Sequence, residues 1–200
     1  KEDWKNLFSL LEEKIEKCIE SDIQYFEGNI ARVCHGLLEV GDQFIIGNSM
    51  PIREVDMFTS TSTIQIDTYA NRGASGIDGL ISTGLGVAKG KSNQRSLLLI
   101  GDLSFYHDMN GLLAANRYNI NITIVIENNN GGGIFKKLSL DKNNNAFNEF
   151  WETPTNLDIE KVANLYNFNF YRSMTTQVFR KHLNHCLSNK GLNMIEAVIQ

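Results

Sequence analysis

The sequence predicts an α/β protein in which a parallel sheet carries helices on both faces. Apolar runs of strand length alternate with segments of helical periodicity, which favours right-handed strand–helix–strand units. Two of these runs, 96-SLLLIG-101 and 121-NITIVIE-127, are almost wholly apolar, as expected for strands that helices cover on both faces. With 200 residues, 42% of them apolar and 21% charged, the chain suits a single compact domain with its own core.

The N-terminal part is expected to begin with two helices. Apolar residues at helical spacing predict the first helix over 3–20. Ser21, followed three residues later by Gln24, predicts a capping box that opens a second helix ending near Gly41. A short buried strand at 43-QFIIG-47 and a helix start at 51-PIREVDMF-58, with proline at the favoured first position, come next.

The alternation then continues to the end of the chain. The predicted strands are 64–69, 96–101, 121–127, 168–172 and 192–199, and the predicted helices are 78–89, 104–118, 158–167 and 175–188. We find no internal repeat and no linker, so residues 1–200 are expected to form one domain, with 1–22 as a helical lead-in. The mid-helix start and the apolar end of the chain suggest a piece of a larger protein.

Composition and charge exclude several functional classes. No run of 18 uncharged apolar residues predicts a membrane span, and the first residues do not resemble a secretory signal. The net charge of −4 and the absence of a dense basic cluster argue against nucleic-acid binding. Cys18, Cys34 and Cys186 lie far apart without metal-ligand spacing, so we expect reduced thiols in a cytoplasmic protein.

Three predicted strands end in loops rich in polar residues or glycine: 47-GNSM-50, 101-GDLS-104 and 128-NNNGGG-133. In open parallel sheets, ligands bind outside the carboxyl ends of the strands. Glycine permits backbone conformations and close approaches that other residues do not. We therefore expect these three loops to meet and to form a binding site.

Asp102 and the asparagines after Glu127 suit a hard cation such as Mg²⁺. Magnesium takes few protein ligands and completes its coordination with phosphate oxygens and water. Alone, either loop has a simpler interpretation, since Asn and Gly are common in turns and Asp is a common helix cap. The 27 residues between Asp102 and Asn129 equal about one helix and one strand, so both are expected at the same edge of the sheet.

The two loops together resemble a known signature. Gly101-Asp102 followed by Asn128-Asn129-Asn130-Gly131 is similar to the GDG…NN signature of thiamine-diphosphate enzymes, with Leu103 in place of the last glycine. Four blocks between about 30 and 140 resemble one family among these enzymes, the 2-succinyl-5-enolpyruvyl-6-hydroxy-3-cyclohexene-1-carboxylate (SEPHCHC) synthases of menaquinone biosynthesis. The blocks are 47-GNSMPIREVD-56, 71-NRGASGIDG-79, 101-GDLSFYHDMNGL-112 and 128-NNNGGGIF-135.

The resemblance implies a thiamine-diphosphate-binding fold with a defined site. The implied ligands of Mg²⁺ or Mn²⁺ are the Asp102 carboxylate, the Asn129 side chain and the Gly131 carbonyl oxygen. Ile77 is expected to wedge beneath the cofactor and to keep it bent. The implied contacts to thiamine diphosphate are Ser49, Met50, Gly76, Ile77, Asp102, Leu103, Ser104, Asn129, Gly131, Gly132, Gly133 and Ile134.

The resemblance also implies the substrates. The family decarboxylates 2-oxoglutarate and adds the resulting succinyl unit to isochorismate. Arg53 and Arg72 are expected to anchor substrate carboxylates, for which a guanidinium fork is well shaped. Phe135 and Leu138 are expected to line the apolar side of the pocket. Outside the matching blocks, such arginines would be read as solvated surface residues and such apolar residues as core.

Enzymes of this family use two related domains from different subunits, in a homodimer or homotetramer. The chain corresponds to the C-terminal, diphosphate-binding domain, and we expect it to be inactive without the pyrimidine-binding domain, which supplies the activating glutamate. Glu54 and Glu127 do not lie in the context of that domain. The alternatives are another thiamine-diphosphate lyase or decarboxylase, a non-enzymatic Mg²⁺–diphosphate module, and a plain α/β interaction domain. The polar stretch 141–150 is a candidate mobile segment over the site.

Overall fold

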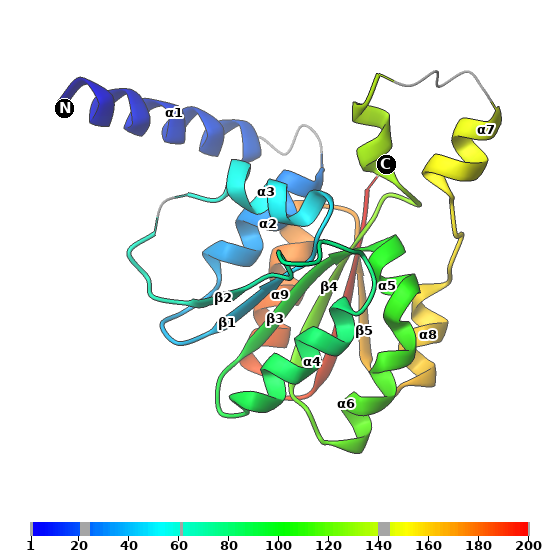
Figure 1. Ribbon diagram of the computed structural model, residues 1–200. Coiled ribbons are helices and arrows are strands. Elements are labelled where there is room, and N and C mark those ends of the chain that lie inside the picture. The colour runs from blue at the N-terminus through cyan, green and yellow to red at the C-terminus, as the bar shows by residue number, and fades with distance from the viewer. Residues whose placement is uncertain (1, 21–24, 61, 140–144, 200) are drawn as a thin grey trace.

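The fold is a parallel sheet, as predicted. The computed structural model describes residues 2–20, 25–60, 62–139 and 145–199. In this part of the chain, six strands form one sheet of order β2-β1-β3-β4-β6-β5, and every neighbouring pair is parallel (Figure 1). The strands are β1 (Gln43–Ile46), β2 (Asp67–Tyr69), β3 (Ser96–Gly101), β4 (Ile122–Asn128), β5 (Asn169–Ser173) and β6 (Leu192–Val198).

Helices connect the strands and cover both faces of the sheet. The α-helices are α1 (Glu2–Glu20), α2 (Glu27–Gly36), α3 (Met50–Phe58), α4 (Leu80–Gly90), α5 (Asp102–Asp108), α6 (Leu113–Arg117), α7 (Asn145–Phe147), α8 (Ile159–Leu165) and α9 (Thr176–Ser188). Two 3₁₀ turns, Met109–Leu112 and Gly133–Lys137, and a π-helical turn, Asn148–Glu152, complete the described elements.

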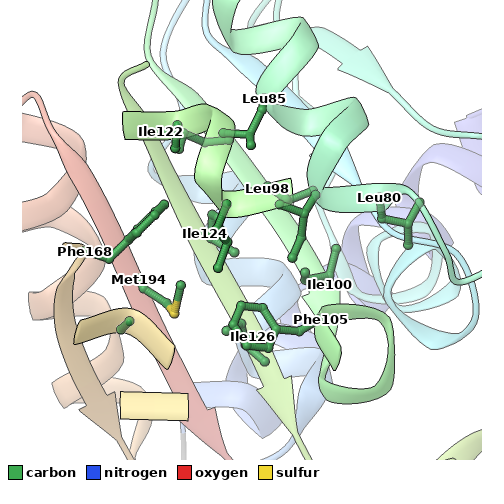
Figure 2. Packing of buried hydrophobic residues seen from close by; sticks show 14 of the residues in the cluster. Leu80, Leu85, Leu98, Ile100, Phe105, Ile122, Ile124, Ile126, Phe168 and Met194 are labelled. Carbon is green, nitrogen blue, oxygen red and sulfur yellow. The ribbon is translucent and has the colours of Figure 1, made fainter. Parts of the chain in front are cut away.

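Each face of the sheet has its own hydrophobic core because side chains alternate along a strand. Leu98, Ile124 and Met194 point to the face covered by α4, α5, α6 and α8 (Figure 2). Leu97, Val125 and Ile195 point to the face covered by α2 and α9. The near-continuous apolar runs of β3 and β4 therefore serve both cores, which confirms the predicted fold class.

The second helix begins later than predicted. Ser21 and Gln24, the expected capping box, lie outside the described residues. Within the described part, α2 starts at Glu27, because Phe26 is extended and its backbone N–H donates to the Asn29 side-chain oxygen at 3.2 Å. Asn29 therefore makes one of the two hydrogen bonds of a capping box, at a different place in the chain.

Two further boundaries differ from the predictions. Helix α2 ends at Gly36 instead of near Gly41. The strand predicted over 64–69 is reduced to three residues at the edge of the sheet. Its neighbour β1 begins at Gln43, which pairs with Asp67, so the residues before Asp67 have no strand to pair with.

The helix predicted over 104–118 is broken into three pieces. A 3₁₀ turn separates α5 from α6, and it contains Gly111, where a Cβ would lie 2.6 Å from the Ser82 hydroxyl oxygen. Just before the turn, the Asp108 carboxylate accepts hydrogen bonds from the backbone N–H and the hydroxyl of Ser82, at 2.6 and 3.0 Å. The break thus lets one helix cap the N-terminus of α4.

Helix α1 forms as predicted but lies at the margin of the molecule (Figure 1). Its side-chain ion pairs join Glu12 and Glu16 to Arg32 of α2, at 3.7 and 3.9 Å. Its large apolar side chains stay largely in contact with solvent, as in Trp4, which is 76% exposed. No helix among the described residues is long and apolar enough to cross a membrane. Cys34 and Cys186 are buried, and neither forms a disulfide within the described residues.

Candidate cofactor-binding site

The carboxyl ends of β1, β3 and β4 meet at a cavity of about 120 Å³. Gly101 of β3 lies in register with Glu127 of β4, so Asp102 follows one strand beside the start of the Asn/Gly loop. In the sheet, β2 lies on one side of β1 and β3 lies on the other, so the strand order reverses at β1. Ligands bind at such a reversal point in open parallel sheets. The lining residues are Glu27, Ser49, Met50, Pro51, Ile77, Gly101, Asp102, Leu103, Ser104, Glu127, Asn129, Gly131, Gly132, Gly133, Ile134 and Phe135.

Asp102 is a buried acid, 5% exposed, at the floor of this cavity. Its carboxylate accepts hydrogen bonds from the backbone N–H groups of Leu103, at 2.8 Å, and Gly131, at 2.7 Å. Burial raises the pKa of Asp102 from 3.8 to about 6, although these hydrogen bonds act in the opposite direction. No basic side chain of the described residues forms an ion pair with it.

Asn129 lines the same cavity as Asp102. Its side-chain nitrogen donates to the Glu27 carboxylate at 3.2 Å, and no hydrogen bond to its side-chain oxygen is found within the described residues. Gly133 makes room for this amide, because a Cβ there would lie 2.6 Å from the Asn129 nitrogen. An acid, a free amide oxygen and nearby backbone carbonyls form an oxygen donor set that suits Mg²⁺ or Mn²⁺.

The glycines that follow Asn130 are required by close backbone contact. Gly131 has a φ of 141°, a region that side chains other than glycine rarely adopt, and a Cβ there would overlap the Glu152 carbonyl oxygen. The Gly132 N–H donates to that same oxygen at 2.6 Å. The loop thus lies directly against the π-helical turn, which leaves its other side for the cavity.

The loop after β1 supplies the opposite wall. Asn48 is fully buried; its amide nitrogen donates to the Gly76 carbonyl at 2.7 Å, and its oxygen accepts from Arg72 at 3.0 Å. Ser49 has a φ of 72°, and α3 starts immediately after it. Asn48 therefore ties the loop after β1 to the residues that precede Ile77.

Comparison with known proteins shows the family. The profile described as "Thiamine pyrophosphate enzyme, C-terminal TPP binding domain" matches residues 59–197, which include Asp102 and the Asn/Gly loop. This chain belongs to the thiamine pyrophosphate (TPP, or thiamine diphosphate) enzymes.

Curated relatives indicate one family among the TPP enzymes. The chain is 36% identical over 196 residues to a protein of Roseiflexus sp. (strain RS-1) named 2-succinyl-5-enolpyruvyl-6-hydroxy-3-cyclohexene-1-carboxylate synthase, covering 96% of this chain and 34% of that protein. A protein of the same name from Oceanobacillus iheyensis is 40% identical over 193 residues, covering 96% and 33%. The resemblance to SEPHCHC synthases is confirmed, and the chain spans about a third of the length of these relatives.

A solved structure shares the fold. A protein from Mycobacterium smegmatis, described as thiamin diphosphate-dependent, superposes with a TM-score of 0.68 at 14% identity, over 89% of this chain and 32% of that chain. At this identity the likeness concerns the fold alone. It agrees with the thiamine-diphosphate-binding fold expected from the signature residues.

Most of the residues that the sequence singled out in this TPP-binding domain lie together. The cavity is lined by Ser49, Met50, Ile77, Asp102, Leu103, Ser104, Asn129, Gly131, Gly132, Gly133, Ile134 and Phe135. Four other candidates lie outside its lining. Arg53 and Arg72 are exposed, Leu138 is 50% exposed, and Gly76 contributes through the contact of its carbonyl with Asn48.

Four lining residues were not among the sequence candidates: Glu27, Pro51, Gly101 and Glu127. Glu127 had a signal, since it is an acid at the end of an otherwise apolar strand. Glu27 had none, because 102 positions separate it from Asn129, the residue that it contacts. Only folding brings α2 to the end of β4.

Glu127 also belongs to a buried pair of acids beneath the cavity. Its carboxyl group lies close to that of Glu54 on α3, and both side chains are buried. Two ionised carboxylates repel each other in such a place, so burial and this proximity favour the protonated form. Burial raises the pKa of Glu54 from 4.5 to about 7 and raises that of Glu127 well above its usual range.

Proposed function

We propose that this chain is the diphosphate- and metal-binding part of a SEPHCHC synthase, which decarboxylates 2-oxoglutarate and adds the succinyl unit to isochorismate in menaquinone biosynthesis. The observation that carries the proposal is the buried Asp102 carboxylate, which has no basic partner among the described residues and lies beside a free amide oxygen. The names of the curated relatives support the choice of reaction.

The cation would be held by the Asp102 carboxylate, the Asn129 side-chain oxygen and the Gly131 carbonyl oxygen. Asp102 accepts a hydrogen bond from Gly131, so two of the three residues are already in contact. Three protein oxygens leave further positions for phosphate oxygens, which is the usual way in which Mg²⁺ binds phosphate groups in proteins. Mn²⁺ accepts the same donors.

The diphosphate would lie against the backbone of Gly132, Gly133 and Ile134 and the hydroxyls of Ser49 and Ser104. The N–H groups of Gly132 and Gly133 donate to the carbonyls of Glu152 and Gly131 in this structure, so they would have to exchange these partners to donate to the diphosphate. Met50, Ile77 and Leu103 would pack against the rest of the cofactor. When bound, thiamine diphosphate supplies the electron sink that decarboxylation requires. The contribution of this chain is to orient the cofactor and, through apolar residues such as Phe135, to keep water from it.

Arg53 and Arg72 would bind the carboxylates of the substrates at the rim of the cavity. Each guanidinium is held by one hydrogen bond, Arg53 to the Ser49 carbonyl and Arg72 to Asn48, and keeps other N–H groups for a substrate. Leu138 would contribute apolar surface at the same rim. Two such cations favour dicarboxylate substrates. A preference for pyruvate would instead indicate a different TPP-dependent decarboxylase or lyase.

The activating glutamate would come from a pyrimidine-binding domain on a neighbouring subunit of a cytoplasmic homodimer or homotetramer. Residues 1–200 alone would then bind the metal and the diphosphate but would not form product. Assaying SEPHCHC formation by the isolated chain tests this part of the proposal, and measurable turnover would contradict it.

The site itself is tested by calorimetric titration of thiamine diphosphate with Mg²⁺ into this chain and into the complete natural protein. We expect metal-dependent binding that Asp102→Ala weakens by more than about 100-fold, because the only charged ligand is lost. Asp56→Ala, an exposed acid on α3, is the matched control and should bind as the natural chain does. Absence of metal-dependent binding in the complete protein would refute the proposed site.

A further inference from the structure

Glu27, at the start of α2, reaches the predicted metal ligand Asn129. Its carboxylate accepts a hydrogen bond from the Asn129 side-chain nitrogen at 3.2 Å, and both residues line the cavity. No role for Glu27 follows from the signature residues. The contact raises the question of what an acid contributes behind an uncharged ligand.

The packing of α2 on α3 fixes the position of Glu27. The rings of Phe26 and Phe58 meet edge to face, with their centroids 5.3 Å apart. Gly28 permits this contact, because a Cβ there would overlap the Phe26 ring and would lie 2.9 Å from that of Phe58. The Arg32 side chain also donates to the Phe58 carbonyl, at 3.0 Å. The first turn of α2 is therefore held in place on both sides of Glu27.

A carboxylate accepts hydrogen bonds and donates none, whereas an amide has a donating and an accepting end. When the Asn129 nitrogen faces Glu27, the oxygen of the same amide must point the other way. A charged acceptor also polarises the amide and increases the electron density on its oxygen. Neutral contacts would fix the amide less strongly, since either end could face a group that both donates and accepts.

We propose that Glu27 is a positioning residue, whose carboxylate holds the Asn129 amide with its oxygen turned toward the cation. This inference rests on the proposed function, because it requires that Asn129 bind a metal. Residues behind metal ligands commonly orient them in this way, and their loss weakens metal affinity about 10- to 100-fold.

The test uses the complete natural protein, with Mn²⁺ as the probe in the presence of thiamine diphosphate, and measures bound Mn²⁺ by electron paramagnetic resonance. Glu27→Ala should weaken Mn²⁺ binding about 10- to 100-fold. Glu27→Gln should weaken binding less, by about threefold, because its side-chain oxygen still accepts from Asn129 but its neutral amide fixes the orientation of Asn129 less strongly. Glu160→Ala, which removes another acid from the first turn of a helix far from the cavity, should bind normally.

A double mutant separates positioning from a general effect on the fold. In an Asn129→Ala background, adding Glu27→Ala should change Mn²⁺ binding by less than about twofold, because its partner is already absent. Thermal melting without ligands checks that each variant is folded, and Glu27→Gln keeps the test valid if Glu27→Ala is not. Normal binding by Glu27→Ala, equal losses in both Glu27 variants, or independent effects in the double mutant would each overturn the proposal.

The outcomes also distinguish this inference from the proposed function. If the natural protein binds Mn²⁺ in a manner that depends on Asp102, the metal site stands, and only the role of Glu27 is decided by the variants. If the natural protein binds no Mn²⁺ with thiamine diphosphate, the proposed function fails, and the inference fails with it.

Discussion

Glu54 and Glu127 place two acids in the interior of the protein, where an ionised carboxylate is poorly solvated. Glu54 is 2% exposed, and one oxygen of each carboxyl group has no hydrogen-bond partner among the described residues. Besides burial, the negative charge of Glu27 raises the pKa of Glu54, while Lys137 lowers it. The pair is therefore stable when it holds protons and becomes costly as it loses them.

The pH dependence of stability follows from the pKa of Glu54, which is raised from 4.5 to about 7. Between these values the folded protein holds a proton that the unfolded chain has lost, so the contribution of Glu54 is complete below pH 4.5 and is lost as the pH rises through 7. Glu54→Gln cannot ionise and should lose less stability over this range. We expect its unfolding free energy, relative to the natural chain, to rise by about 1 to 3 kcal/mol from pH 4.5 to pH 8.

Urea unfolding of the metal-free protein at several pH values measures this difference. Asp56→Asn, an exposed acid on the same helix, is the control for the change of charge. If Glu54→Gln and the natural chain show the same pH dependence, Glu54 does not retain its proton in the folded state.

At the scale of an element, the Asn/Gly loop is held by the segment that follows it at some distance in the chain. Asn130 and Asn156 exchange two hydrogen bonds. The side-chain nitrogen of Asn130 donates to the side-chain oxygen of Asn156 at 3.0 Å, and the backbone N–H of Asn156 donates to the side-chain oxygen of Asn130 at 3.1 Å. Lys136 and Glu152 add an ion pair at 2.9 Å. The loop is rich in glycine, but these contacts hold it in place. Its glycines therefore allow other backbone atoms to come close to it.

Two glycine substitutions in this loop are expected to act differently. Gly131→Ala places a Cβ against the Glu152 backbone at a φ of 141°, and it should destabilise the fold by about 1 to 3 kcal/mol and abolish cofactor binding. Gly133→Ala meets only the Asn129 side chain, at 2.6 Å, which can rotate away. It should leave stability within about 0.5 kcal/mol and still weaken Mg²⁺-dependent binding of thiamine diphosphate.

Thermal unfolding and calorimetric titration of the two variants check both parts of this prediction. If Gly133→Ala binds thiamine diphosphate as the natural chain does, the added methyl group does not displace the Asn129 amide. An unaffected Gly131→Ala variant would show that the contact with Glu152 is not required.

At the scale of the whole molecule, the two cores around the sheet account for the packing, and α1 contributes little to it. Trp4 is 76% exposed, Leu7, Phe8 and Leu11 are 46 to 49% exposed, and the ion pairs that join α1 to α2 are long, at 3.7 and 3.9 Å. Exposed apolar side chains gain little from folding, and ion pairs of this kind contribute at most about 1 kcal/mol.

Deleting residues 2–20 is therefore expected to lower the unfolding free energy of the chain by less than about 1 kcal/mol. Urea denaturation followed by circular dichroism measures the change. As the comparison, Leu183→Ala of α9, fully buried in the core, should cost about 2 to 5 kcal/mol. A loss from the deletion that approaches the loss in Leu183→Ala would show that α1 is part of the folded core.

The sequence was most informative where one local property was strong. The apolar runs of β3 and β4 identified two of the central strands, and the loops after them identified Asp102 and Asn129 as neighbours. Boundaries were wrong where a distant partner decided them. The edge strand β2 is short because β1 is short, and the helix predicted over 104–118 is broken where Asp108 turns to cap α4.

By itself, the sequence determined the fold class, the edge of the sheet that carries the site, and the residues of the cofactor signature, because strand period and loop chemistry are local properties of the chain. Only the tertiary structure decided the rest: that Glu27 contacts Asn129, that Glu54 and Glu127 share a buried position, and that Glu152 lies against Gly131 and Gly132. These contacts join residues that are far apart in sequence, and they depend on how α2, α3 and the segment after the Asn/Gly loop pack around the ends of the strands.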